Sequence, residues 1–465
     1  MTRSDIGLIG LSTMGQNLAL NIERNGFKIS VFNRTAEITR DFTAQKTKGK
    51  KFFPFYSLEK FISSLEKPKK IILLIKAGEP VDEMIKKLLP FLEKGDLLID
   101  GGNSFFRDTE RRQEFLKEKG IELLGMGVSG GEEGALKGPS LMLGGERRAF
   151  KKAEDILVKI SAKFKGEPCC TYLGPRGAGH FVKMVHNGIE YGIMQALGEI
   201  YDFLKNGLDL SQQQIIREFT VRQKSLFASY LMEISLEVLN NVDSETSKPL
   251  IESILDEAEQ KGTGKWTTQT ALDLGVPILG ISSAVEARII SSWKKKRERL
   301  SSLFPKKGIE ANKKIEIQLL FDAFLASILM IYQEGFFLLR QGSEEFGYQL
   351  NLAQVAKTWR AGCIIRAKLT EKIASILEKS SENKLLLETS FFQNQLKKLE
   401  NSWREVISVF LACTIPCPTM SACLAEFDSL RQKRLESASL IQGLRDRFGS
   451  HGFRRIDKKG DFHVD

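Results

Sequence analysis

The sequence predicts a doubly wound α/β domain, then a large all-helical domain and a C-terminal tail. Short, continuously apolar β-rich runs alternate with helix-length segments up to about residue 178, as in a parallel sheet covered on both faces. From Gly179 the strand signals almost disappear, and Leu, Ile, Phe and Ala recur at helical spacing to about residue 435. A chain of 465 residues also exceeds one ordinary core. We therefore expect domains at 1–178 and 179–435 and a tail at 436–465.

The first domain is expected to contain five strands with helices between them. The predicted strands are DIGLIG (5–10), KISVFN (28–33), KIILLIK (70–76), DLLIDGG (96–102) and IELLGMGVS (121–129). In the second domain, long helical patterns are interrupted at KGTGKW (261–266), LGVPILG (274–280) and TIPCPT (414–419). The tail combines one helical pattern with a Gly-rich basic end.

Composition excludes several classes of protein. The longest apolar run, residues 319–332, is interrupted by Asp322 and falls short of the roughly 20 residues of a membrane span, so a core helix is expected. The N-terminus enters a strand without an apolar leader, which predicts a cytoplasmic protein. The net charge of +11 favours anionic ligands, yet the basic runs at 67–70 and 293–299 lack interleaved aromatic residues, so nucleic acid is not expected.

The six cysteines form no disulfide framework. Cys413, Cys417 and Cys423 lie near one another, but their spacing matches no common zinc pattern and no histidine lies among them. We expect free thiols in a reducing compartment and no metal.

The first strand leads into a glycine turn. Residues 10–15 read GLSTMG, with Gly10 for the tight turn and Gly15 for close helix packing, while Ser12 occupies the usual second glycine. The turn follows a strand and opens a helix, so the pyrophosphate of a dinucleotide would lie at the helix N-terminus.

The second strand ends at FNRT, where NAD-binding proteins place an acidic residue for the ribose hydroxyls. Without that carboxylate a 2′-phosphate is not repelled. Arg34 can pair with the phosphate while Asn33 and Thr35 donate hydrogen bonds, so NADP is favoured over NAD.

Two more Gly-rich segments follow later strands, IDGGNSFFRDTERR and GVSGGEEGALKGPSLMLGG. Glycines at the carboxyl ends of strands allow a ligand to approach the crevice of the sheet. Asn103 and Ser129 supply neutral hydrogen-bonding groups there.

A polar face then appears on an apolar helix, in GHFVKMVHNGIEYG (179–192). Lys183, His186, Asn187, Glu190 and Tyr191 fall at i, i+3, i+4, i+7 and i+8, on one side of about two turns. One interpretation of this pattern is an ordinary solvent-exposed helix face with an i,i+7 charge pair. Because a nicotinamide-binding domain precedes this helix in the sequence, the lysine and the glutamate can instead act as the base and the acid of a hydride-transfer reaction.

At this point the chain resembles the decarboxylating 6-phosphogluconate dehydrogenase family along nearly its whole length. The resemblance rests on ten blocks in order: IGLSTMGQNLALNI, FNRT, IKAG, IDGGNS, GVSGGEEGA, GPSLM, HFVKMVHNGIEYG, KGTGKW, WRAGCIIRA and RDRFGSH. It implies a Rossmann domain, a helical domain, a tail and a homodimer.

The resemblance also implies roles for individual residues. Lys183 would be the general base and Glu190 the general acid. The NADP site would comprise Gly10, Leu11, Ser12, Thr13, Met14, Gly15, Asn33, Arg34, Thr35, Ile75, Lys76, Ala77 and Asn103. The substrate would contact Asn103, Ser129, Gly130, Gly131, His186, Asn187, Tyr191, Lys261, Arg288, Arg445 and His451, with Arg445 and His451 supplied by the partner subunit.

Four positions depart from the family pattern: Ser12 replaces alanine, Glu259 replaces glycine, Ile193 replaces an acidic residue and Gly452 replaces threonine. The chain also ends without the usual Thr-x-Trp. No proposed catalytic group is lost, but Gly452 and the short end put the ordering of the tail in question.

The implied reaction is oxidation of 6-phosphogluconate at C3 and loss of carbon dioxide to give ribulose 5-phosphate. A neutral Lys183 requires its pKa to fall from about 10.4 to 7 or 8, and Lys261, Arg288 and the nicotinamide are the expected causes. Two alternatives stay open: a dehydrogenase of smaller β-hydroxyacids, and a catalytically silent NADP-binding or scaffold protein.

Overall fold

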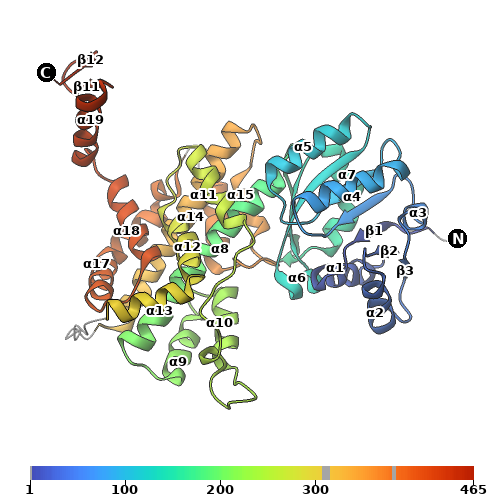
Figure 1. Ribbon diagram of the computed structural model, residues 1–465, viewed down its shortest axis with the longest axis horizontal. Coiled ribbons are helices and arrows are strands. Elements are labelled where there is room, and N and C mark those ends of the chain that lie inside the picture. Colours follow the sequence, from blue (N-terminus) through green and yellow to red (C-terminus); the bar gives the residue numbers. More distant parts are fainter. Residues whose placement is uncertain (1–2, 306–314, 380–383, 465) are drawn as a thin grey trace.

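The computed structural model describes residues 3–305, 315–379 and 384–464. An eight-stranded sheet occupies the N-terminal part, and helices make up most of the rest (Figure 1). This confirms the predicted fold class.

The sheet has the order β10-β7-β6-β5-β4-β1-β2-β3. Its strands are β1 (Ile6–Ile9), β2 (Ile29–Phe32), β3 (Phe52–Phe55), β4 (Lys70–Leu73), β5 (Leu97–Asp100), β6 (Glu122–Ser129), β7 (Ser140–Gly144) and β10 (Cys170–Gly174). The five predicted runs form β1, β2, β4, β5 and β6. Because the chain moves from β1 to β2 on one side and to β4 on the other, the order reverses between β1 and β4. In such sheets ligands bind at the carboxyl ends of the strands beside this point.

The sequence did not predict β3, β7 or β10. Pro54 is tolerated in β3 because that strand lies at the sheet edge. Strand β7 lies within the second Gly-rich segment, which was expected to allow a ligand to approach rather than to form a strand. It runs antiparallel to β6, so the sheet is mixed rather than wholly parallel.

Side chains alternate between two faces of the sheet. Ile72 and Ile99 belong to the apolar cluster of one face, and Ile71 and Leu98 to that of the other. The first face is covered by α1 (Thr13–Arg24), α2 (Ala36–Lys46), α6 (Gly131–Lys137) and α7 (Arg147–Ile160). The second is covered by α3 (Leu58–Ser63), α4 (Glu79–Leu88), α5 (Phe106–Lys117) and the short η1 (Leu89–Phe91). A small hairpin, β8 (Lys163–Phe164) and β9 (Glu167–Pro168), precedes β10.

The helical part is built around two long buried helices, α8 (Ala178–Asp202) and α14 (Ile317–Glu345), which pack against each other. The other elements are η2 (Phe203–Gly207), α9 (Gln212–Arg222), α10 (Tyr230–Asn240), η3 (Leu250–Glu252), α11 (Thr263–Asp273), α12 (Leu279–Ser291), α13 (Lys294–Leu303), α15 (Leu352–Thr358), α16 (Lys368–Lys379), η4 (Leu386–Glu388), α17 (Ser390–Ala412) and α18 (Pro418–Leu430). By length and composition α14 could cross a membrane, but 89% of its most apolar window is buried inside the protein, as in a core helix.

The tail lies apart from this body. Figure 1 shows α19 (Glu436–Gly449) and the hairpin of β11 (Phe453–Arg454) and β12 (Asp461–Phe462) projecting beyond α18, at the opposite end of the molecule from the N-terminus. Asp446 holds this unit together, since its carboxylate accepts hydrogen bonds from Gly452 N (2.7 Å), Val464 N (2.5 Å) and His463 Nδ1 (2.7 Å).

Candidate active site

A cavity of about 590 Å³ opens where the strand order reverses. Its lining comes from the ends of β1, β2, β4, β5 and β6, from the start of α1 and from α4. The lining residues are Ile9, Gly10, Ser12, Met14, Asn33, Arg34, Thr35, Ile38, Leu74, Ile75, Lys76, Pro80, Glu83, Met84, Lys87, Gly101, Gly102, Asn103, Val128 and Lys261. Most of the predicted cofactor residues therefore face one cavity.

The glycine turn shapes the cavity floor. Gly10 has φ +103°, and a Cβ there would lie 2.3 Å from the carbonyl oxygen of Leu74. A Cβ on Gly15 would lie 1.9 Å from the carbonyl oxygen of Gly10, so glycine is what lets α1 pack this closely on the turn. Leu11, Thr13, Gly15 and Ala77 were predicted to contact the cofactor but are absent from the cavity lining.

Electrostatics at the cavity favour an anion. Four of its described lining residues are cationic, namely Arg34, Lys76, Lys87 and Lys261, and Glu83 is the one carboxylate among them. Arg34 is exposed at the end of β2, and Asn33 is fixed by a hydrogen bond from Leu11 N to its Oδ1 (3.0 Å). The cavity thus fits a phosphorylated dinucleotide.

The sequence did not identify the α4 side of the cavity. Pro80, Glu83, Met84 and Lys87 line it from that helix. Their spacing follows one helical face directly after the IKAG block, which is the signal that would have located them.

The first turns of α8 lie unusually close to the sheet. A Cβ on Gly127 of β6 would lie 2.5 Å from Lys183 Cβ, and one on Gly179 would lie 2.6 Å from the carbonyl oxygen of Gly125. Gly127 directly precedes Val128, which lines the cavity. The β6 and α8 glycines therefore hold the polar face of α8 against the strand whose carboxyl end contributes to the cavity.

Burial shifts both proposed catalytic groups toward their neutral forms. Lys183 is 6% exposed, and desolvation lowers its pKa against the opposing attraction of Glu190. Desolvation likewise raises the pKa of Glu190, against Lys183 and Arg288. The main cause at Lys183 is thus burial, whereas the sequence interpretation had named neighbouring cations.

A hydrogen-bonded chain extends from β6 across the same helix face. Ser129 Oγ lies 3.2 Å from His186 Nε2, His186 Nδ1 lies 3.1 Å from Asn187 Oδ1, and Asn187 Nδ2 donates to Thr263 Oγ1 at 3.0 Å. Desolvation holds the pKa of His186 well below its usual value, so its ring is neutral. Thr263, at the start of α11, was not predicted.

Arg288 lies beside this chain on α12. Its guanidinium carbon is 3.4 Å from the ring centroid of Tyr191, a cation–π contact. A Cβ on Gly264 would lie 2.6 Å from the Tyr191 ring, which explains the second glycine of KGTGKW. Six predicted site residues therefore come together within a single subunit: Lys183, His186, Asn187, Glu190, Tyr191 and Arg288.

Two glycines turn the chain after Ser129. Gly130 (φ +122°) and Gly131 (φ +61°) lead into α6, and a Cβ on Gly130 would lie 2.5 Å from the carbonyl oxygen of Gly362. Ile364 N donates to Ser129 Oγ at 3.4 Å, so the WRAGCIIRA segment also packs here.

The structure does not bring Arg445 and His451 to this site within one chain. Both are exposed on the projecting tail (Figure 1), where Arg445 Nη1 donates to Gln442 Oε1 at 3.2 Å. Gly452 adopts φ +69°, a conformation that glycine permits more readily than threonine. All six cysteines are free thiols, and within the ranges that the structure describes no three His, Cys, Asp or Glu residues are grouped to hold a metal.

Comparison with known proteins covers the whole chain. Residues 5–174 match the model of the NAD binding domain of 6-phosphogluconate dehydrogenase, and residues 179–465 match that enzyme's C-terminal domain. The chain is 48% identical to the NADP(+)-dependent, decarboxylating 6-phosphogluconate dehydrogenase of Bacillus subtilis and 44% identical to the decarboxylating enzyme of Escherichia coli, covering 100% of this chain and 99% of each relative. Its structure is similar to Plasmodium falciparum 6-phosphogluconate dehydrogenase, described in apo form and in complexes with NADP+ and with 6-phosphogluconate, with a TM-score of 0.95, 42% identity and 99% coverage of both chains.

Proposed function

The chain belongs to the 6-phosphogluconate dehydrogenase family, and from this premise we propose that it converts 6-phosphogluconate and NADP to ribulose 5-phosphate, carbon dioxide and NADPH. The observation that carries the proposal is the Lys183–Glu190 face of α8, with Lys183 buried, which packs on β6, the strand whose Val128 lines the cationic dinucleotide cavity.

The residues of the cavity would hold NADP by its phosphates and its ribose. The Gly10–Gly15 turn and the start of α1 would present backbone N–H groups to the pyrophosphate, and Arg34 would pair with the 2′-phosphate. Lys76 and Asn103 line the cavity nearer to β4 and β5. When bound, NADP supplies a hydride acceptor.

Lys183 acts first as a base. Burial lowers the pKa of its amine and so favours the neutral form, which takes the proton of the substrate's C3 hydroxyl while the hydride leaves C3. The C3 carbonyl then accepts the electron pair released when the C1 carboxylate departs as carbon dioxide, and protonated Lys183 returns its proton to that oxygen.

Glu190 completes the reaction. Burial raises the pKa of its carboxyl and so favours the protonated form, which protonates the former C2 of the enediol as Lys183 again takes the enol proton. This carbon becomes C1 of ribulose 5-phosphate. Arg288 and Lys261 hold the anionic substrate.

The substrate site is completed by a second copy of the chain. The tail exposes Leu440, Ile441, Leu444 and Phe448, the last 76% exposed, so a partner surface is needed to bury them. In the resulting homodimer each tail presents Arg445 and His451 to the substrate phosphate of the other subunit. The free thiols suit a reducing compartment, and the cytoplasm is the proposed location.

The test is an assay with 6-phosphogluconate labelled at C1. NADPH and labelled carbon dioxide should form in equal amounts, with no added metal. NADPH formation without carbon dioxide release would contradict the decarboxylating function, and activity with small β-hydroxyacids instead would indicate the alternative dehydrogenase.

A further inference from the structure

Two loops form the part of the cavity nearest to β6. The β4–α4 loop contributes Leu74, Ile75 and Lys76, and the β5–α5 loop contributes Gly101, Gly102 and Asn103. Both loops line the cavity, so their separation decides where Lys76 and Asn103 lie. Side chains that hold these loops from the side away from the cavity can therefore affect cofactor binding without contacting the cofactor.

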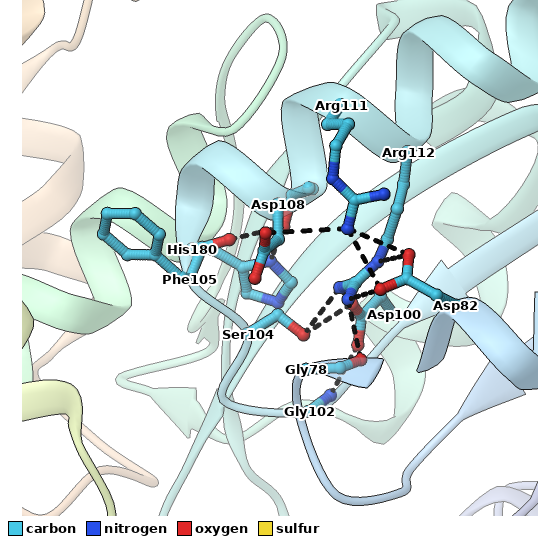
Figure 2. Close-up of polar contacts among 11 residues, drawn as sticks. Gly78, Asp82, Asp100, Gly102, Ser104, Phe105, Asp108, Arg111, Arg112 and His180 are labelled. Carbon is cyan, nitrogen blue, oxygen red and sulfur yellow. Dashed lines mark hydrogen bonds and ion pairs between the residues drawn. The ribbon is translucent and has the colours of Figure 1, made fainter. Parts of the chain in front are cut away.

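Arg112 of α5 lies behind both loops and is 1% exposed. Its Nε and Nη2 donate to the two oxygens of Asp82 at 2.9 and 3.0 Å, and Nη2 also donates to the Gly78 carbonyl at 2.8 Å. Its Nη1 donates to Asp100 Oδ2 and Ser104 Oγ, both at 3.3 Å (Figure 2). All five N–H groups of the guanidinium therefore have acceptors, shared between the two loops.

The two aspartates extend this network into the loop backbones. Asp100 Oδ1 accepts from Gly102 N at 3.1 Å and Oδ2 from Ser104 Oγ at 2.7 Å, so the residues on both sides of Asn103 are held. Asp82 lies in the first turn of α4, where Arg111 binds it as well. The hydrogen bond from Arg112 is the largest cause that lowers the Asp82 pKa to about 2, so this carboxylate stays charged.

The same helix also contacts α8. Thr109 Oγ1 lies 2.7 Å from His180 Nδ1, and His180 is 1% exposed, three residues before Lys183. Burial lowers the pKa of His180, so the ring is a neutral hydrogen-bonding partner. Helix α5 is thereby joined to both cofactor loops and to the helix that carries the proposed base.

Another buried ion pair lies next to the starts of β4 and β5, at the ends of these strands remote from the cavity. Lys69 Nζ lies 2.9 Å from Asp96 Oδ2, and both side chains are buried. Asp96, which directly precedes β5, and Asp100, its last residue, are therefore both buried aspartates, one remote from the cavity and one behind it. Comparing substitutions of these two aspartates separates a general effect on protein stability from an effect on the cofactor loops.

We propose that Arg112, with Asp82 and Asp100, is a positioning residue that fixes the β4–α4 and β5–α5 loops for NADP. The inference rests on the proposed function of the cavity. Loops that are already fixed need not be ordered when the cofactor binds, so loss of the network should weaken binding more than it slows turnover at saturation.

The experiment compares Asp100→Asn, Arg112→Lys and Asp82→Asn with Asp96→Asn. Calorimetry measures the Kd for NADP, thermal unfolding gives Tm, and kinetics give KM and kcat. The three network variants should raise the Kd and KM for NADP about tenfold or more, while kcat at saturating NADP changes by less than about threefold. Asp96→Asn should lower Tm but leave the Kd unchanged.

Asp82 is less buried than Asp100, so Asp82→Asn provides a folded variant if Asp100→Asn unfolds. Equal Kd values in Asp96→Asn and Asp82→Asn would overturn the inference, as would a lower Tm in the network variants without a change in Kd. If the wild-type protein itself bound no NADP, the proposed function of the cavity would fail instead.

Discussion

Single residues decide the chemistry through their burial. Lys183 and Glu190 lie on one face of α8, about two turns apart, and desolvation favours the neutral amine of one and the neutral carboxyl of the other. A solvated helix face would leave both charged. The plain interpretation of this face as a surface ion pair is therefore wrong, because Lys183 is buried.

Replacement of the proposed base should abolish oxidation. Lys183→Met should lower kcat by a factor of about 10³ or more with little effect on the Kd for NADP, since the methionine fills the site but accepts no proton. Glu190→Gln should still form NADPH in the first turnover and then release ribulose 5-phosphate slowly. Rapid-quench kinetics measure both steps, with the exposed Lys117→Met as the control. Near-normal turnover in Lys183→Met would refute the mechanism.

Arg34 should determine the choice of cofactor. Because Arg34 is exposed at the cavity and is proposed to pair only with the 2′-phosphate, Arg34→Ala should raise the KM for NADP about tenfold or more and leave that for NAD nearly unchanged. Arg40→Ala, on the surface of α2 beside Glu37, is the matched control. Equal effects on NADP and NAD would show that Arg34 does not contact the 2′-phosphate.

At the level of elements, the N-termini of α12 and α18 are capped by buried glutamates that belong to other helices. Glu199 of α8 accepts hydrogen bonds from Thr419 N and Met420 N at 2.8 and 3.0 Å, and Glu334 of α14 accepts from Gly280 N and Ile281 N, both at 2.8 Å. Each satisfies backbone N–H groups that a helix start leaves free. These contacts fix α12, which carries Arg288, against the long core helices.

The cap at α18 should make stability depend on pH. Desolvation raises the Glu199 pKa to about 7, above its unfolded value, against hydrogen bonds from Thr419, Met420 and Gln195 and with Asp202 nearby. Its contribution is therefore full below about pH 4.3 and is lost as the pH rises through 7, by up to about 3 kcal/mol. In urea titrations from pH 5 to 8, Glu199→Gln should reduce this pH dependence. The exposed Glu405→Gln should not, and an unchanged slope in Glu199→Gln would count against the assignment.

The whole molecule requires a partner if Arg445 is to reach the substrate. A Lys183→Met chain and an Arg445→Ala chain should each be nearly inactive alone. After equal mixing and subunit exchange they should recover about a quarter of wild-type activity, because half of the dimers are mixed and each mixed dimer has one intact site. Activity is measured alongside mass spectrometry of the exchanged dimers.

The control mixes two chains that each carry one substitution in the same helix, α8. Lys183→Met mixed with Glu190→Gln should recover nothing, since both groups lie on α8 and no mixed site contains both. If Arg445→Ala shows exchange by mass spectrometry yet no recovery, then Arg445 acts within its own chain or not at all.

The sequence alone determined the fold class and the chemistry of the site. Continuous apolar strands, the Gly10–Gly15 turn, the FNRT segment and the five polar residues of one helix face are local patterns, and local patterns report local conformation and residue chemistry. They were sufficient to predict the α/β sheet, the helical domain, the dinucleotide and its preference for NADP.

Only the tertiary structure decided how these parts meet. Strand β7 was not recognised within its Gly-rich segment, where Gly144 is needed for close packing against the start of α8, and the α4 wall of the cavity comes from a helix that no motif marked. The five acceptors of Arg112 and the burial of Lys183 depend on segments far apart in the sequence. Burial and hydrogen-bond partners are properties of the packed chain, so pKa shifts and loop positions appear only once the chain has folded.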